Sequence, residues 1–392
     1  MKMRNTLFAM FALVAGMASA QVATESAGGN EKTLFERIAK IEKKSDKFNL
    51  FFNMHYGFDA NFNAGDFEQG AFNMRQFRIE AKGKVTDWLS YRWRQRLNRD
   101  NAGGGMIDNL PNSIDIASLT FAVTDKFSIS AGKQCAAYGG IEYDLNPIEI
   151  YQYSEIINNM SNFMSGVMFT YDFTPNQQLA FQLLDSRNNS IEDTYGENLA
   201  ANKLPLVYTL NWNANMFGGA WQTRWSASVM DEVKDKYMYY VALGNQFNFS
   251  PKCNMFVDFM SSYEELDRKG IMTNMLGGKK NFNGHNMYNT LYNSLVAKVN
   301  WRFCPKWNFF VKGMLESAAI YGGEDGYADG NYRTSVGYLT GVEYYPMESN
   351  LHLFLTFVGQ THMFTERAKA LGQNDYSTQR VSLGFIYQLP AF

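Results

Sequence analysis

Apolar and polar residues alternate with a period of two along most of this 392-residue chain. Such alternation places successive side chains on opposite faces of a β-strand. From residue 48 onward, helical periodicity of comparable length is absent from the sequence, so an all-β fold is predicted. Clear examples of the alternation occur at residues 50–58, 77–84, 167–173, 206–212, 221–229 and 381–389.

The turns between these segments fall into two classes that alternate along the chain. Short turns rich in Thr, Ser, Pro and Asp reverse the chain at once, whereas the other connections are long, polar and rich in Gly and Asn. The count is about sixteen strands, with both chain ends on the short-turn side. We therefore expect a transmembrane antiparallel β-barrel with short periplasmic turns and long extracellular loops. The short turns are 85–88, 123–126, 173–176, 249–252, 303–306 and 345–350, and the long loops are 98–113, 133–163, 186–203, 264–287, 320–332 and 364–376.

The N-terminal region carries the features of an export signal. Lys2 and Arg4 precede an apolar run, and Ala18-Ser19-Ala20 has the small residues that a signal peptidase requires. We expect residues 1–20 to be a signal peptide, residues 21–47 a periplasmic segment, and residues 48–392 the barrel. Apolar positions within 33–45 predict a short amphipathic helix, which could be a trimer-forming stub or a simple lead-in to the first strand.

Composition narrows the class of protein. Aromatic residues make up 16% of the chain although the mean hydropathy is −0.32, which suits strands with two unlike faces. No apolar stretch after the signal is long enough for a helical membrane span. A net charge of −2 argues against a nucleic-acid partner. The three cysteines and four histidines are dispersed, and no catalytic motif is found, so neither catalytic residues nor a metal or other cofactor are predicted.

One strand carries three arginines on a single face. In "LSYRWRQRL" (89–97), Tyr91 and Trp93 suit lipid and leave Arg92, Arg94 and Arg96 to the barrel interior. Basic side chains facing lipid would cost about 2–4 kcal/mol each near the bilayer midplane. Folding this strand against the preceding one pairs Arg92 with Lys82, Arg94 with Glu80 and Arg96 with Arg78. The predicted lumen wall, which also includes Lys84, has six cations and one acid.

The loop at 133–163 is too long for a simple hairpin connection. It mixes apolar residues with acids, including Tyr138, Glu142 and Asp144, which predicts that it packs against another part of the molecule. We expect it to fold into the lumen and constrict the pore, with an extracellular flap as the alternative.

Two blocks of the chain, "FNMRQFRIEAKGKVTDWLSYRWRQRL" (72–97) and "FSISAGKQCAAYGGIEY" (127–143), resemble the phosphate-selective porin O and P family in its Bacteroidota form. The resemblance implies an outer-membrane barrel of sixteen strands, assembled as a homotrimer, with an arginine-lined pore and an inturned third loop. It makes Arg75, together with Arg78, Arg92, Arg94 and Arg96, a candidate anion contact, and it places Lys133 at the start of the constriction loop. The segment "QCAAYGG" departs from the family pattern at the start of that loop.

These observations predict an outer-membrane porin for passive diffusion of small solutes, with a preference for phosphate-like anions. Arginine suits such ligands because its planar guanidinium donates two parallel hydrogen bonds to an oxyanion. The predicted pore-lining contacts are Arg75, Arg78, Lys82, Lys84, Arg92, Arg94 and Arg96. Two alternatives remain: a structural or adhesive barrel that acts through its extracellular loops, and a barrel-borne hydrolase. The predicted partners are small anionic solutes and outer-membrane lipid.

Overall fold

The computed structural model describes residues 46–99, 108–323 and 326–391, and these residues form sixteen β-strands in a single sheet. The expected signal peptide and the amphipathic helix at 33–45 lie outside the described residues. The strands are β1 (Asn49–Asn63), β2 (Asp66–Lys84), β3 (Leu89–Arg96), β4 (Ile114–Ala122), β5 (Phe127–Cys135), β6 (Phe163–Thr174), β7 (Gln177–Asp185), β8 (Leu206–Met216), β9 (Trp221–Asp231), β10 (Tyr237–Ser250), β11 (Cys253–Leu266), β12 (Tyr288–Cys304), β13 (Trp307–Ile320), β14 (Gly330–Tyr344), β15 (His352–Phe364) and β16 (Tyr376–Pro390).

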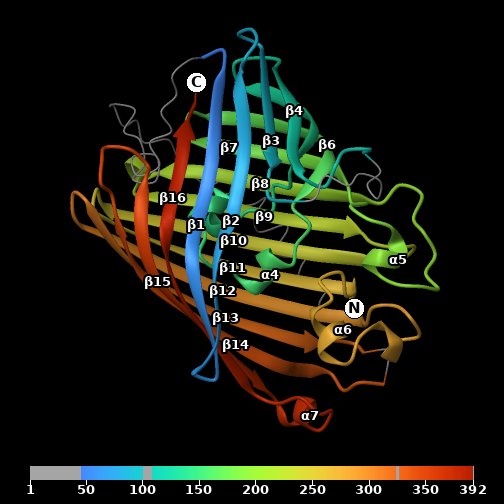
Figure 1. The fold of residues 1–392 in the computed structure, drawn as a ribbon. Helices are drawn as coiled ribbons and strands as arrows, with labels where there is room; N and C mark the ends of the chain where they lie inside the picture. Colours follow the sequence, from blue (N-terminus) through green and yellow to red (C-terminus); the bar gives the residue numbers. More distant parts are fainter. Residues whose placement is uncertain (1–45, 100–107, 324–325, 392) are drawn as a thin grey trace.

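The sheet closes on itself (Figure 1). Every strand pairs antiparallel with its neighbours in sequence, and β1 pairs with β16 from Phe51 opposite Pro390 to Asn63 opposite Thr378. Closure pairs the first strand with the last, so neither β1 nor β16 is a free edge whose backbone groups hydrocarbon could not solvate. The predicted sixteen-stranded antiparallel barrel is confirmed.

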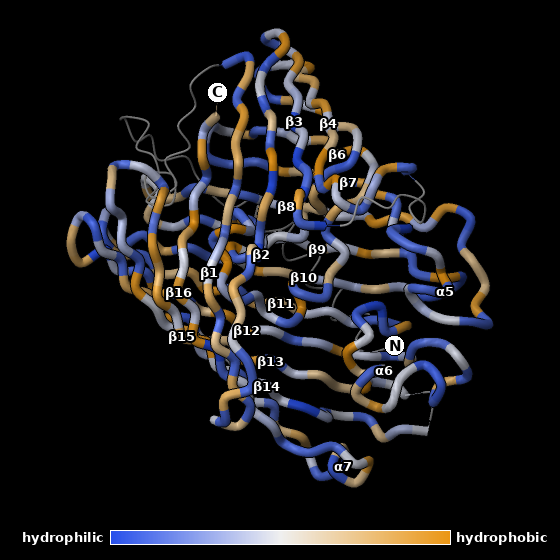
Figure 2. The backbone as a smooth tube through the Cα atoms, viewed as in Figure 1, coloured by the Kyte–Doolittle hydropathy of each residue, from blue (hydrophilic) through white to orange (hydrophobic). Residues whose placement is uncertain are grey.

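The two faces of the strands differ as the alternation predicts. On β13, Trp307, Phe309 and Val311 are exposed on the outside, whereas Phe310 and Lys312, which alternate with them, are buried inside. On β16, Val381 and Leu383 are exposed and Ser382 is buried. The strands in Figure 2 accordingly change repeatedly between hydrophilic and hydrophobic along their length. An apolar outer surface and an inner face with many polar groups are what a membrane barrel requires.

The connections at the two ends of the barrel differ in length. At the end that holds the C-terminus, the links between strands are short turns, one of which contains η2 (Phe217–Gly219). The opposite end carries the long loops, with exceptions at Ala64-Gly65 and residues 232–236. No helix in the described part of the chain is long and apolar enough to span a membrane. The loop helices are α3 (Ile141–Asp144), η1 (Pro147–Glu149), α4 (Glu155–Asn158), α5 (Ile191–Thr194), α6 (Ile271–Met275), η3 (Lys279–Asn281) and α7 (Glu366–Lys369).

A hydrophobic cluster fills part of the barrel interior, which the alternation did not predict. It brings together inward-facing residues of β6 to β14 and apolar residues of the two loops 136–162 and 267–287, with Phe364 at the end of β15 and Ala368 of α7. Met260 and Met314 on the wall, Ile156 on α4 and Met272 on α6 are all nearly inaccessible to solvent. The interior is therefore packed where this cluster covers β6 to β14, and the polar cavities lie beside the cluster.

Candidate functional site

The arginine-bearing strands pair in the register that the sequence predicts. Lys82 lies opposite Arg92, Glu80 opposite Arg94, and Arg78 opposite Arg96. Like charges opposite each other on neighbouring strands repel, so this wall needs counter-charges. The Glu80 carboxylate is one of these counter-charges, and it accepts a hydrogen bond from Arg92 Nε at 2.9 Å.

Two β-bulges add charged residues to the inner face. Where His55 pairs with Gln76 and Tyr56 with Met74, Arg75 is the extra residue on β2. Where Arg94 pairs with Ile116 and Gln95 with Ile114, Asp115 is the extra residue on β4. A bulge turns a side chain away from the face that strict alternation would give it. This explains how Arg75 and Arg78 both face the interior, although strict alternation along β2 would place them on opposite faces.

Asp115 is the main counter-charge of the wall. Its carboxylate lies 2.8 Å from Arg96 Nε, 3.4 Å from Arg94 Nε and 3.6 Å from Arg78 Nη1, and its side chain is 1% exposed. The prediction of a wall with a single acid is therefore wrong, because the bulge brings a second carboxylate into the centre of the cations.

The basic side chains differ widely in their access to the lumen. The Arg92 side chain is 46% exposed and that of Arg96 22%, whereas those of Arg94 and Arg78 are only 7% and 2% exposed. Lys82 Nζ lies over the Phe51 ring at 5.1 Å, and Lys84 is at the short-turn end of β2. Arg92 and Arg96 are therefore the arginines best placed to meet a solute.

Residues 136–162, called loop L3 here, cross the barrel interior. Figure 1 shows α4 inside the ring of strands. The backbone N–H groups of Ile141 and Glu142 donate to the Asp258 carboxylate of β11 at 2.9 and 2.7 Å. Farther along, the Tyr151 ring stacks on Phe310 with centroids 5.2 Å apart, and its hydroxyl donates to Glu343 at 2.9 Å. These contacts fix L3 to the wall at several strands.

Ion pairs also anchor L3. Glu142, which is fully buried, pairs with Lys312 of β13 and accepts hydrogen bonds from the Ser154 backbone and hydroxyl at 3.2 and 2.6 Å. Glu155 at the start of α4 pairs with Arg333 of β14. A buried charge is tolerated only when it is paired in this way.

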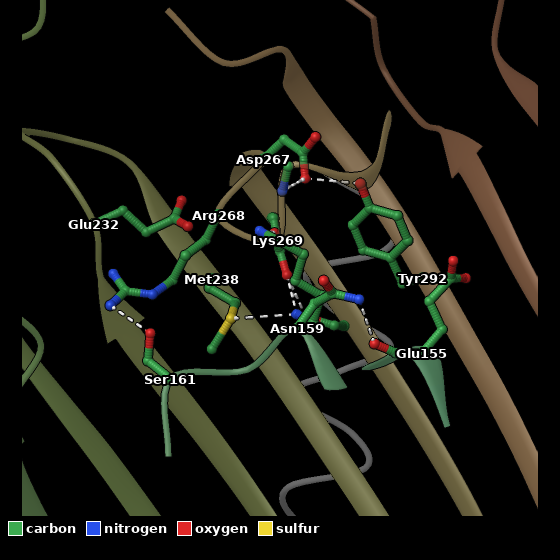
Figure 3. A network of polar contacts seen from close by, with 12 residues as sticks. Glu155, Asn159, Ser161, Glu232, Met238, Asp267, Arg268, Lys269 and Tyr292 are labelled. Atoms are coloured by element: carbon green, nitrogen blue, oxygen red, sulfur yellow. Dashed lines mark hydrogen bonds and ion pairs between the residues drawn. The ribbon is translucent and has the colours of Figure 1, made fainter. Parts of the chain in front are cut away.

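The end of L3 is held by a polar network with the outer loops, shown in Figure 3. Arg268 donates to the Ser161 hydroxyl at 3.2 Å and to the Ser186 carbonyl at 2.8 Å. The neighbouring Asp267 accepts from the Tyr292 hydroxyl at 2.7 Å. Glu232 of the β9–β10 loop accepts from the Leu266 N–H at 3.1 Å, and burial raises the pKa of its carboxyl. The network ties three loops to the last residues of L3.

The four residues predicted for the constriction loop lie in different surroundings. Tyr138 is buried in the hydrophobic cluster beside Tyr240, and Glu142 forms the anchor already described. Asp144 is 47% exposed and pairs with Arg224 at 3.0 Å. Lys133 belongs to β5 and forms a buried ion pair with Asp108 at 3.2 Å.

Three polar cavities adjoin one another along the barrel. The outer cavity, of about 330 Å³, is lined by residues that include Arg96, Arg99 and Lys133. The arginine cavity, of about 170 Å³, is lined by residues that include Arg92, Arg94 and Asp144. The inner cavity, of about 60 Å³, lies near the short-turn end. The space therefore narrows from the loop end toward the short-turn end.

Neighbouring cavities share lining residues. Phe163 lines both the outer cavity and the arginine cavity, and Leu145 of L3 lines both the arginine cavity and the inner cavity. The Phe163 ring also lies 5.2 Å from the Arg94 guanidinium and 5.6 Å from that of Arg96. Cation–π contacts at these distances orient an arginine without neutralising its charge.

Not all predicted contacts line these cavities. Arg75 pairs with Asp59 and donates to the Ser382 hydroxyl at 2.9 Å, so it is held on the β1–β16 side of L3. Asp115, Asp59 and Phe163 were missed from the sequence. The available signal was an acid within an apolar strand, as in Ile114-Asp115-Ile116, since such an acid is costly unless it meets cations.

A closed barrel of sixteen strands with an apolar exterior, an inward-folded loop and polar cavities along its axis defines a channel of the Gram-negative outer membrane. The model of the phosphate-selective porin O and P family matches residues 48–389, and the chain belongs to this family. This agrees with the resemblance seen in the sequence. No curated protein matches the chain in sequence.

Solved structures share the fold at low sequence identity. The outer-membrane channel DcaP of Acinetobacter baumannii is 13% identical with a TM-score of 0.57, covering 87% of this chain and 97% of that chain. An anion-selective porin from Comamonas acidovorans is 8% identical with a TM-score of 0.55, covering 88% and 99%. The trimer form of OmpT from Vibrio cholerae is 11% identical with a TM-score of 0.54, covering 87% and 100%.

Proposed function

We propose that this porin passes small oxyanions by passive diffusion along β3, without catalysis. The observation that carries the proposal is the excess of positive charge on one wall. Seven basic side chains of β2 and β3 face three acids, Asp59, Glu80 and Asp115, and the Arg75–Asp59 pair among them lies on the β1–β16 side of L3. The basic residues are Arg75, Arg78, Lys82, Lys84, Arg92, Arg94 and Arg96.

The cavities suggest a route for the anion. It enters the outer cavity beside Arg96 and Arg99, passes Phe163, and reaches Arg92 and Arg94. Successive cationic sites let an anion leave one contact as it makes the next. The sites therefore attract the anion into the pore without holding it there. A guanidinium can hold two oxygens of one oxyanion, which favours phosphate-like solutes over halide.

Two acids of L3 near the arginine wall are compensated by basic residues of other strands. The Asp144 carboxylate lines the arginine cavity and pairs with Arg224, so part of its charge is compensated by the wall. The neighbouring acid of L3, Glu142, is compensated by Lys312 and is removed from the cavity. These two acids therefore leave the positive excess of the arginine wall in place.

Reversal potentials across a salt gradient test the proposal. Arg92, Arg94 and Arg96 are changed together to Ser, and the anion-to-cation permeability ratio is expected to fall severalfold toward one. Arg302→Ser is the control, because Arg302 lies at a short turn and donates to the Pro305 carbonyl. If the triple variant does not assemble, the same permeability ratio is measured for the single variant Arg92→Ser, which removes the most exposed of the three arginines. An unchanged ratio in both would mean that the arginines are structural.

We also propose a homotrimer in the outer membrane. The family resemblance and the trimer form of the Vibrio cholerae relative support it. Chemical crosslinking of the protein in native outer membranes is expected to give a band of three chains. A band of one chain, under conditions that crosslink a known trimeric porin, would contradict the proposal.

A further inference from the structure

The inner cavity holds two opposite charges that lack strong partners. Lys298 of β12 and Glu149 of η1 both line it, one from the barrel wall and the other from L3. It lies beyond the arginine cavity on the short-turn side and is bordered by side chains of β10 to β15. These residues are separate from the arginine wall, which carries the anion preference proposed above.

The lysine is unpaired among the described residues. Lys298 lies directly opposite Lys312 on the neighbouring strand, and Lys312 is neutralised by Glu142. No carboxylate of the described chain lies within 4 Å of Lys298 Nζ, which sits over the Phe310 ring at 4.7 Å. An aromatic face leaves the ammonium its full charge and its hydrogen-bond donors. Lys298 therefore offers a cationic group to the cavity.

The glutamate on the other side also lacks a permanent cationic partner. Within the described residues, no lysine or arginine lies within 4 Å of the Glu149 carboxylate, and His352 Nε2 is 3.9 Å away. The His352 Nδ1 shares a hydrogen bond with the Asn350 carbonyl at 2.9 Å. Since a carbonyl only accepts, Nδ1 carries a proton, and a neutral ring then has Nε2 as an acceptor. With a neutral His352 ring, Glu149 and His352 together form an acceptor-rich wall.

One further unpaired acceptor adjoins this wall. Asn308 Oδ1 and His352 Nε2 are buried and have no hydrogen-bond partner, although both residues line the cavity. Glu343, in contrast, is already satisfied, because Tyr151, Asn308 and Tyr345 all donate to it. Buried acceptors without partners are rare in proteins and call for a ligand or water. The acceptors next to Glu149 match the several N–H donors of one ammonium group.

We propose that the inner cavity is a subsite for a small zwitterion of the amino-acid type. The solute's carboxylate meets Lys298, and its ammonium group meets Glu149 and the acceptors beside it. A simple anion would leave Glu149 unpaired, and a simple cation would leave Lys298 unpaired. A volume of about 60 Å³ holds several waters or one such solute. The porin thus carries zwitterions as well as the anions proposed for the arginine wall.

Block of single-channel current in planar bilayers tests this subsite. The probes are glycine, β-alanine and 4-aminobutyrate, each compared with propionate and propylamine, which carry only one of the two charges. At least one amino acid is expected to block half the current at a concentration at least tenfold below that of propionate or propylamine. Comparing the three amino acids shows which charge separation fits the cavity. If none blocks better than propionate and propylamine, the subsite is overturned.

Two variants test which residue meets the ammonium group of the solute and which meets its carboxylate. In Glu149→Gln, the amino acid is expected to block the current no better than propionate does. In Lys298→Met, it is expected to block no better than propylamine does. The controls are Glu348→Gln and Lys306→Met, which change exposed residues of short turns. An advantage that survives both cavity variants would contradict the assignment.

The same bilayers separate this inference from the proposed anion preference. The reversal potential of the wild-type protein reports the arginine wall, and amino-acid block reports the inner cavity. Anion preference without amino-acid block overturns only the subsite. Amino-acid block without anion preference overturns only the proposed function of the arginines.

Discussion

Asp115 shows how much one bulged residue changes an electrostatic wall. Strict alternation along β4 would place Asp115 on the outer face with Ala117. Instead, the Asp115 side chain faces inward and lies near Arg78, Arg94 and Arg96. The sequence predicted the pairing of the arginines with β2 correctly, because period two and a tight turn fix the register. It could not predict the bulge, since an extra residue leaves the pattern of apolar positions on either side intact.

We predict that Asp115→Asn destabilises the barrel and strengthens its anion preference. Removing one partner of a buried ion pair costs about 3–5 kcal/mol, because Arg78 and Arg94 would remain buried without a counter-charge. The midpoint of thermal unfolding, measured from the shift of the folded band on gels, should be lower than in the wild type. Asp125→Asn, in the exposed turn after β4, is the matched control and should leave the midpoint unchanged. A midpoint equal to that of the wild type would mean that Asp115 is not the main counter-charge.

L3 is the element on which the shape of the cavities depends. Its length and its mixture of apolar and acidic residues predicted packing against another part of the molecule. The sequence could not show which acids would be anchors, because Glu142 and Asp144 are two residues apart yet one is fully buried and the other half exposed. That difference arises from the backbone. Gly139 and Gly140 have φ of 70° and 90°, and they turn the chain so that the next two N–H groups meet Asp258.

A double-mutant cycle on the L3 anchor tests this account. Lys312→Met is expected to destabilise the protein by about 3–5 kcal/mol, because Glu142 would keep a buried charge without its partner. Adding Glu142→Gln should recover part of that loss, as expected for residues in direct contact. Denaturant unfolding gives the free energies, and current noise in bilayers should rise in Lys312→Met as L3 loosens. Additive losses in the double variant would mean that the pair does not couple.

At the scale of the whole molecule, the barrel interior is divided into an apolar and a polar part. Loop lengths and alternation predicted the closed barrel, because both depend on local geometry. The division was not predicted, since an inward-facing Met260 or Met314 is covered by loops from distant parts of the chain. The three cavities lie beside this cluster, so a solute crosses the barrel off its centre.

Cysteine accessibility tests the off-centre route in the assembled channel. Cysteines are introduced one at a time after Cys135, Cys253 and Cys304, which are free, are changed to Ser. A charged methanethiosulfonate reagent should label Arg92→Cys and reduce the current, because that position is open to the arginine cavity. Met260→Cys and Met314→Cys should stay unlabelled in the folded protein and become labelled only after unfolding. Rapid labelling of both in the folded channel would mean that water fills the β6–β14 side and that the route is central. Both methionines face inward from the wall, so a difference in labelling between them and Arg92→Cys reports where water lies within the barrel.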